Sequence, residues 1–121
     1  MPSLKTLQAF ADTVESNDHV GAITNFYATD ARTQENDGEW RVGRDVLAAR
    51  EAAVLASVAG VKTTRLGPLL VDGDHSAICW RFDFTGKDGK VRSIEEVAWQ
   101  TWRGEQLIEE RFFFDPRQMG R

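Results

Sequence analysis

The feature of the sequence that most limits its possible folds is a stretch from Ser76 to Asp115 in which apolar and charged residues alternate. Alternation with a period of two indicates β-strands whose two faces meet different surroundings. Asp88-Gly89 and Gly104-Glu105 interrupt the stretch, and such pairs are typical of two-residue hairpin turns. The stretch therefore predicts three consecutive antiparallel strands, at residues 76–85, 90–103 and 105–115.

The first half of the chain has helical rather than strand periodicity. Apolar residues recur at intervals of three and four in a first helix from Leu4 to Val14. The second helix follows the capping residues Ser16-Asn17-Asp18 and continues to about Tyr27, and the third runs from about Gly43 to Ala59. Helices followed by strands predict a single α+β domain spanning residues 1–121, with the helices on one face of an antiparallel sheet. Shorter strands are expected at residues 30–35, 61–66 and 69–71.

The composition narrows the function classes. The 121 residues suffice for one hydrophobic core, and a net charge of -4 with scattered basic residues argues against a nucleic-acid partner. No apolar run reaches the length of a membrane span, and the N-terminus lacks a signal-peptide pattern. A single cysteine, Cys79, fits a cytoplasmic protein. Two distant histidines, one cysteine and no glycine-rich phosphate loop predict neither a metal nor another cofactor.

The register of the three strands decides which side chains share a face. Two-residue turns would pair Lys87 with Lys90 and Arg103 with Gln106. One face would then be polar and the other aromatic, although a slip by one residue in either hairpin would reverse the faces. The polar face would hold Cys79, Arg81, Asp83, Glu96, Gln100, Arg111 and Asp115. The other face would hold Ile78, Trp80, Phe82, Phe84, Val97, Trp99, Phe112 and Phe114.

Each face permits two interpretations. The charged face could form the floor of a polar pocket, in which Asp83 and Asp115 act as an acid–base pair and Arg81 keeps one of them ionised. It could equally be a solvated ladder of ion pairs, each contributing little to stability. The aromatic face could be an association surface, or it could pack against the helices, in which case the charges would face solvent.

Four short segments carry a resemblance to a known family: Asn25 to Ala31, Gly43-Arg44-Asp45, Trp99 to Arg103 and Glu110 to Pro116. Over nearly its whole length the chain resembles the SnoaL-like group of the nuclear transport factor 2-like (NTF2-like) superfamily, which includes polyketide cyclases, ketosteroid isomerases and limonene epoxide hydrolase. The resemblance implies a cone: a strongly curved, mixed or antiparallel sheet wrapped over three N-terminal helices, with a pocket at the wide end. It also implies a homodimer through the outer sheet face, with Trp80, Trp99, Phe112 and Phe114 at the contact.

The resemblance further assigns roles to individual residues. Asp115 matches the pocket aspartate of the last strand and would be the base, while Arg81-Phe82-Asp83 matches the Arg-x-Asp strand of the epoxide hydrolase. Asn36 matches the asparagine of that hydrolase's Tyr-x-Asn pair, but the tyrosine is absent. The candidate catalytic residues are thus Asp115, Asp83 and Arg81. The candidate ligand-binding residues are Tyr27, Asn36, Trp40, Glu96, Ala98, Gln100, Trp102, Arg111 and Phe113.

Together these observations predict a pocket for a small, largely apolar molecule. If the protein is an enzyme, the expected chemistry is cofactor-free acid–base catalysis of the isomerase, cyclase, dehydratase or epoxide hydrolase type. The alternative is a non-catalytic ligand-binding or protein-association module with the same fold. The sequence leaves open whether the pocket is catalytic and which substrate it takes.

Overall fold

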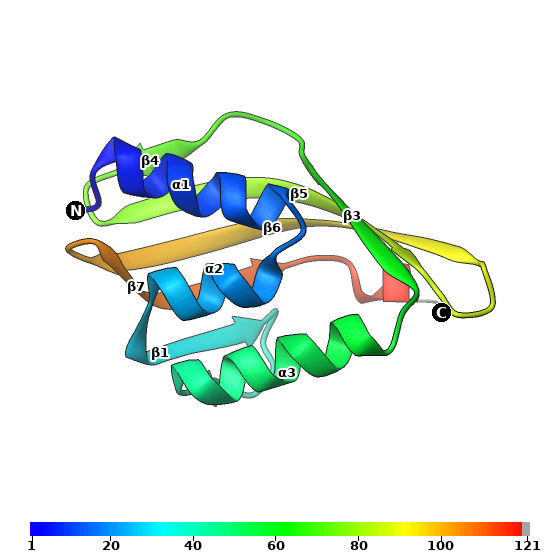
Figure 1. Ribbon diagram of the computed structural model, residues 1–121. Helices are drawn as coiled ribbons and strands as arrows, with labels where there is room; N and C mark the ends of the chain where they lie inside the picture. The colour runs from blue at the N-terminus through cyan, green and yellow to red at the C-terminus, as the bar shows by residue number, and fades with distance from the viewer. Residues whose placement is uncertain (120–121) are drawn as a thin grey trace.

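The computed structural model describes residues 1–119, and in it three helices cover one face of a sheet (Figure 1). The α+β class is confirmed, while the strong curvature of the sheet stays a prediction. The helices are α1 (Leu4–Glu15), α2 (His19–Phe26) and α3 (Arg44–Ala56), and a short 3-10 helix η1 (Pro116–Met119) follows the last strand. The strands are β1 (Tyr27–Glu35), β2 (Arg41–Val42), β3 (Gly60–Arg65), β4 (Leu70–Asp72), β5 (His75–Thr85), β6 (Val91–Arg103) and β7 (Gln106–Phe113).

The sheet is mixed. Its strand order is β2-β1-β7-β6-β5-β3, and β4 pairs with the first residues of β5. Every pair is antiparallel except β1 with β7, which run parallel because the chain passes through α3 and five further strands before it returns beside β1. This return places the early strand β1 and the late strand β7 side by side, so residues from both ends of the sequence can share a site.

The local sequence explains where the helices begin. The Ser3 side chain accepts a hydrogen bond from the backbone N–H of Thr6 at the start of α1, and Asp18 accepts one from Gly21 at the start of α2. The Asp18 carboxylate lies so close to Gly21 that a Cβ atom there would be 2.1 Å from it. A residue larger than glycine would therefore displace this cap.

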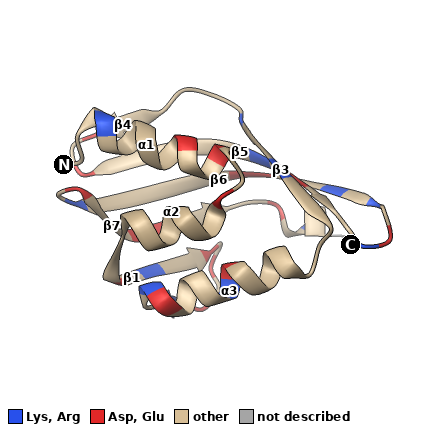
Figure 2. Ribbon diagram, in the orientation of Figure 1, with Lys and Arg blue, Asp and Glu red and all other residues tan. Residues whose placement is uncertain are grey.

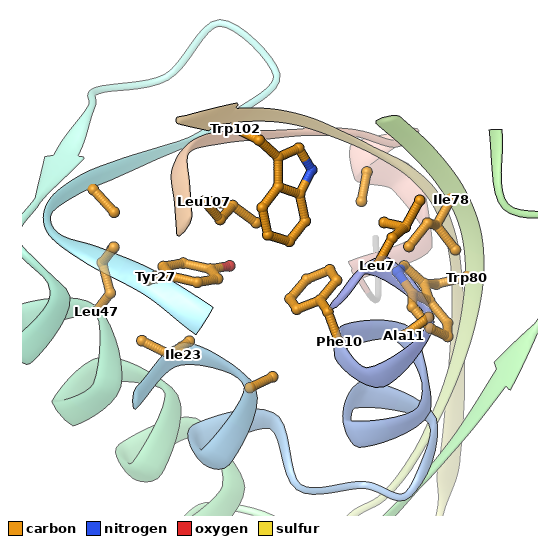
Figure 3. Close-up of a cluster of buried hydrophobic side chains, with 13 residues drawn as sticks. Leu7, Phe10, Ala11, Ile23, Tyr27, Leu47, Ile78, Trp80, Trp102 and Leu107 are labelled. Atoms are coloured by element: carbon orange, nitrogen blue, oxygen red, sulfur yellow. The ribbon is translucent and has the colours of Figure 1, made fainter. Parts of the chain in front are cut away.

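The hydrophobic core lies between the first two helices and the inner face of the sheet (Figure 3). Phe10 of α1 is central to it, with its ring edge-on to Trp102 at a centroid distance of 5.6 Å. Leu7, Phe10, Trp80 and Trp102 are all at most 2% exposed. In contrast, α3 buries only Leu47. The third helix is therefore less closely packed against the sheet than the first two.

Charged residues of both signs occur on helices, strands and hairpins (Figure 2). Among residues 1–119, no helix is long and apolar enough to cross a membrane.

The observed register differs from the predicted one in both hairpins. Thr85 pairs with Val91, so the loop between β5 and β6 holds five residues rather than two, and Arg81 faces Glu95 instead of Glu96. Between β6 and β7 the pairing starts as predicted, with Arg103 opposite Gln106. A bulge then shifts it by one residue, which puts Gln100 opposite Glu110.

These shifts regroup the two faces. On β5 and β7, the residues predicted for the aromatic face point toward the helices. On β6, the residues predicted for the polar face point toward the helices instead. Glu96 and Gln100 consequently lie among aromatic residues on the inner face. Arg81, Asp83 and Arg111 lie on the outer face of the sheet.

Candidate functional site

A cavity of about 290 Å³ lies between the helices and the inner face of the sheet. Its volume is near the lower end of the range for small-molecule pockets. Most of its wall is apolar, and six of its aromatic residues are Phe10, Tyr27, Trp80, Phe82, Phe112 and Phe114. Such a wall suits a compact, largely apolar molecule, and the charged residues that share the wall determine its chemistry. They are Glu35, Arg41, Arg50, Glu51, Arg92, Glu96 and Glu110.

The third helix forms one side of the cavity. Glu51 and Val54 follow Leu47 at helical spacing along α3, and all three line the cavity together with Val58, which lies just beyond the end of the helix. Beyond Ala48, which packs against the core, and Glu51, which lies 3.5 Å from His19, this side of α3 borders the cavity. The cavity thus exists because α3 and the sheet are held apart along the second half of the helix.

Glu110 is the most deeply placed carboxyl group of the cavity, with an exposure of 3%. The Tyr27 hydroxyl donates a hydrogen bond to one of its oxygens, and Gln100 Nε2 donates to the other at 2.8 Å. Burial raises the pKa of Glu110 to about 7, although these two hydrogen bonds oppose the rise. Burial and the neighbouring Glu110 also raise the pKa of Tyr27 well above its usual value.

Glu96 is a second carboxyl group on the cavity wall. Glu96 on β6 pairs with Trp80 on β5. The next residue of β6, Val97, pairs with Phe113 on β7, and Phe114 follows Phe113 in the sequence. The Glu96 side chain is half-buried, and within residues 1–119 no group donates a hydrogen bond to its carboxyl. Burial, followed by the nearby Glu110, Glu35 and Glu51, raises the pKa of Glu96 to about 8. At neutral pH this carboxyl group is therefore mostly protonated.

His19 is a polar residue of the wall that sequence reasoning did not select. It lies at the start of α2, is 8% exposed, and its ring is edge-on to Phe82. Its Nε2 is 2.8 Å from Thr63 Oγ1, and its Nδ1 is 3.5 Å from Glu51 Oε1. His19 thus links α2, α3 and β3 at one side of the cavity. The described residues contain no cluster of three His, Cys, Asp or Glu side chains suited to a metal ion.

No protein-family model and no curated protein sequence matches the chain, but solved structures do. A proposed SnoaL-like polyketide cyclase from Mesorhizobium loti shares 25% identity over 89% of this chain and 95% of its own, with a TM-score of 0.74. An NTF2-like protein of unknown function from Burkholderia pseudomallei shares 15% identity over 96% of this chain and 92% of its own, with a TM-score of 0.80.

The fold is NTF2-like. The structural neighbours are SnoaL-like, NTF2-like and ketosteroid isomerase-like proteins, which confirms the resemblance predicted from the sequence. One neighbour, TerC, was co-crystallised with polyporic acid; it shares 15% identity over 96% of this chain and 93% of its own, with a TM-score of 0.78. Proteins with this fold therefore bind small molecules.

The predicted catalytic residues are not brought together in the NTF2-like fold of this chain. Arg81 donates to Asp83 Oδ1 at 3.1 Å on the outer sheet face, away from the cavity wall. Asp115 lies beyond β7 and forms an ion pair with Arg117 at 2.7 Å. Hydrogen bonds from Ser93 and Arg81 lower the pKa of Asp83, and those from Arg117 lower the pKa of Asp115. The prediction that these aspartates share a pocket is wrong, because the register shift turns Asp83 outward.

The predicted ligand-binding residues divide into three groups. Tyr27 and Glu96 line the cavity. Ala98, Gln100 and Trp102 are buried on the inner face but lie outside the cavity wall. The remaining four, Asn36, Trp40, Arg111 and Phe113, also lie outside the cavity wall.

The contacts of this third group account for their positions. Asn36 accepts a hydrogen bond from the Phe114 backbone N–H, and the Arg111 guanidinium lies 4.7 Å from the Phe113 ring centre. Arg32 lies over the Trp40 ring at 3.9 Å. These four residues therefore make structural contacts and do not line the inner cavity, while Phe113 lines a separate hollow.

The predicted dimer surface needs a similar correction. Trp80 is buried in the core, and Phe112 and Phe114 line the cavity. Only Trp99 of the four predicted contact residues is exposed, at 42%, on the outer face. The even-numbered residues of β5 face the helices, which is the arrangement that the sequence left open as the alternative.

Proposed function

We propose that this protein binds a small, largely apolar molecule in the inner cavity and acts on it by cofactor-free acid–base chemistry. The observation that carries this proposal is Glu96, a carboxyl group on an apolar wall that has no hydrogen-bond donor within residues 1–119. The Glu96 side chain is half-buried, so a ligand that displaces water from its carboxyl has to replace the hydrogen bonds of that water. The Glu96 carboxyl is thus suited to meet a polar group of a largely apolar ligand.

The proton affinity of the two carboxyl groups suits proton transfer. A general acid or base works best when its pKa is near the ambient pH, and those of Glu110 and Glu96 are raised to about 7 and about 8. Both groups line one cavity whose aromatic wall keeps the local dielectric low. Isomerisation, cyclisation, dehydration and epoxide opening all need a proton donor and a proton acceptor of this kind.

The structural neighbours support a small-molecule ligand. TerC was co-crystallised with polyporic acid, and a Catenulispora acidiphila protein with a ketosteroid isomerase-like fold was solved in complex with trimethylamine. The largely apolar cavity of about 290 Å³ is consistent with a ligand of modest size.

A ligand screen followed by variants tests the proposal. Small apolar ketones, epoxides and polyketide-like compounds would be screened by thermal shift at pH 7, and hits would be assayed for turnover. We expect Glu96→Gln to lower the turnover rate of a hit compound at least about a hundredfold. The matched control is Glu95→Gln, because the neighbouring Glu95 lies on the outer face with 56% side-chain exposure and pairs with Arg81.

Three outcomes are distinguishable. Turnover that disappears in Glu96→Gln but persists in Glu95→Gln supports the proposal. Binding without turnover in the wild-type protein would overturn catalysis and identify a ligand-binding module. Turnover that survives both Glu96→Gln and Glu110→Gln would show that the reaction does not use this cavity's carboxyl groups.

A further inference from the structure

A chain of buried hydrogen bonds runs from Trp102 through Ser76 and Gln100 to Glu110. We infer that this chain makes Glu110 the proton acceptor of the cavity and leaves Glu96 as the proton donor. The inference rests on the proposed function, because it assigns roles within that acid–base pair. Ser76, Gln100 and Trp102 do not line the cavity, so they act as positioning residues.

The direction of every hydrogen bond in this series follows from Trp102, its first residue. The Trp102 indole Nε1–H can only donate, and it donates to Ser76 Oγ at 2.9 Å. The single Ser76 hydroxyl proton is then directed to Gln100 Oε1 at 2.6 Å. This contact orients the Gln100 amide so that its NH₂ group donates to Glu110 Oε2 at 2.8 Å.

Tyr27 completes the arrangement from the other side. Its hydroxyl donates to Glu110 Oε1, so each carboxylate oxygen of Glu110 receives one hydrogen bond. The chain is placed by strand pairing, since Ser76 faces Gln100 and Gln100 faces Glu110 across adjacent strands. Ser76, Gln100 and Glu110 are each at most 3% exposed, and hydrogen bonds in such a low-dielectric setting are strong.

The two carboxyl groups therefore differ in the form that the protein favours. Hydrogen bonds donated to both oxygens stabilise the ionised form of Glu110, whereas Glu96 receives none within residues 1–119. The other ionisable groups that act on Glu110 are Tyr27 on β1 and Glu51 on α3, which is itself 3.5 Å from His19. Glu35 acts in addition on Glu96, and Arg41 lies 3.5 Å from Glu35.

These roles define one proton-transfer step. A proton leaves the bound molecule for a Glu110 oxygen, and Glu96 gives its own proton to another atom of that molecule. The net charge of the ligand is unchanged, and the two carboxyl groups exchange protonation states. Glu96 on β6 and Glu110 on β7 line the same cavity, and Glu110 is the charged group that acts most strongly on Glu96. One small ligand can therefore meet both carboxyl groups.

The test titrates the side-chain carboxyl groups of the ligand-free protein by ¹³C NMR. We expect Glu110 to lose its proton at a lower pH than Glu96. Gln100→Leu and Tyr27→Phe each remove one donor and should raise the pKa of Glu110 by about one pH unit while leaving that of Glu96 nearly unchanged. Trp102→Phe keeps an aromatic ring but removes the N–H that sets the bond direction, so a smaller rise is expected.

The matched control is Thr101→Val, because Thr101 neighbours Gln100 but bonds to His75 outside the chain. A Glu110 titration that stays unmoved in both Gln100→Leu and Tyr27→Phe would overturn the inference. So would a wild-type protein in which Glu96 ionises first. Because these titrations need no ligand, a failed ligand screen overturns the proposed function without changing their result. If a substrate is found, the acidic limb of kcat/KM should move upward in pH in Gln100→Leu.

Discussion

Replacement of Glu96 by glutamine should make the stability of this protein less dependent on pH. The pKa of Glu96 rises from an ordinary 4.5 to about 8 in the folded chain. The folded state therefore binds more protons than the unfolded state between those two pH values, and the free energy of unfolding falls as pH rises through that window. Below about pH 4.5 the group imposes no penalty, and above about pH 8 the whole penalty is present.

The magnitude follows from the difference in pKa. Each pH unit corresponds to about 1.4 kcal/mol, so a difference of about 3.5 units sets an upper limit of about 5 kcal/mol at pH 9. The side chain lines a cavity that water can enter, which reduces this value, and we expect roughly 3 kcal/mol. Glutamine cannot ionise, so Glu96→Gln should exceed the wild-type stability by that amount at pH 9 and by less than about 1 kcal/mol at pH 5, where only the unfolded chain is ionised.

Urea unfolding followed by tryptophan fluorescence at pH 5 and pH 9 measures the effect. Glu95→Gln is the control, because Glu95 lies beside Glu96 in sequence but faces outward toward Arg81. Its stability relative to the wild type should change by less than about 1 kcal/mol between the two pH values. An equal advantage of Glu96→Gln at both pH values, or none at pH 9, would refute the placement of an unpaired carboxyl group in the cavity wall.

Three further predictions concern residues outside this carboxyl pair. Asp83→Asn and Asp115→Asn should leave ligand affinity unchanged in calorimetric titration and leave the unfolding midpoint nearly unchanged, since both aspartates form their ion pairs outside the cavity. Loss of ligand binding would contradict their outward placement. His19→Ala removes a buried hydrogen bond to Thr63 and a ring packed on Phe82. Thermal unfolding should therefore show a free energy of unfolding lower by about 2–3 kcal/mol. A decrease below about 0.5 kcal/mol would be inconsistent with these contacts. A homodimer through the outer sheet face stays a prediction: sedimentation at micromolar concentration should show a dimer that Trp99→Glu dissociates, and a wild-type monomer would end this interpretation.

Periodicity in the sequence was sufficient for the three helices, for all strands except the two-residue β2 and for the α+β class. The alternation from Ser76 to Asp115 corresponds to β5, β6 and β7, and the three predicted helices all occur. The third helix ends at Ala56 rather than Ala59, and the second ends at Phe26, where β1 begins directly. These local patterns are reliable because they depend on backbone geometry that repeats every 2 or 3.6 residues.

The sequence also contained a signal for the role of Glu96, which was predicted to bind a ligand but not to be catalytic. Glu96 interrupts a face of β6 that is otherwise Ile94, Ala98, Gln100 and Trp102, and these four residues are all buried. A single acidic residue within such a face is expensive unless it has a function. The catalytic residues were predicted instead in the segments Arg81-Phe82-Asp83 and Phe113-Phe114-Asp115. The polar residues of these segments form ion pairs with one another or with neighbours on the surface.

What the sequence by itself determined is the set of side chains that share each face of each strand, together with the NTF2-like order of helices and strands. Only the tertiary structure decided which face of one strand continues onto the next. That depends on a five-residue loop between Thr85 and Val91 and on a bulge beside Trp102, each of which shifts the pairing by one residue. Since side chains alternate with a period of two, such a shift exchanges inside for outside. It turned Asp83 to the surface and brought Glu96 and Glu110 to the cavity.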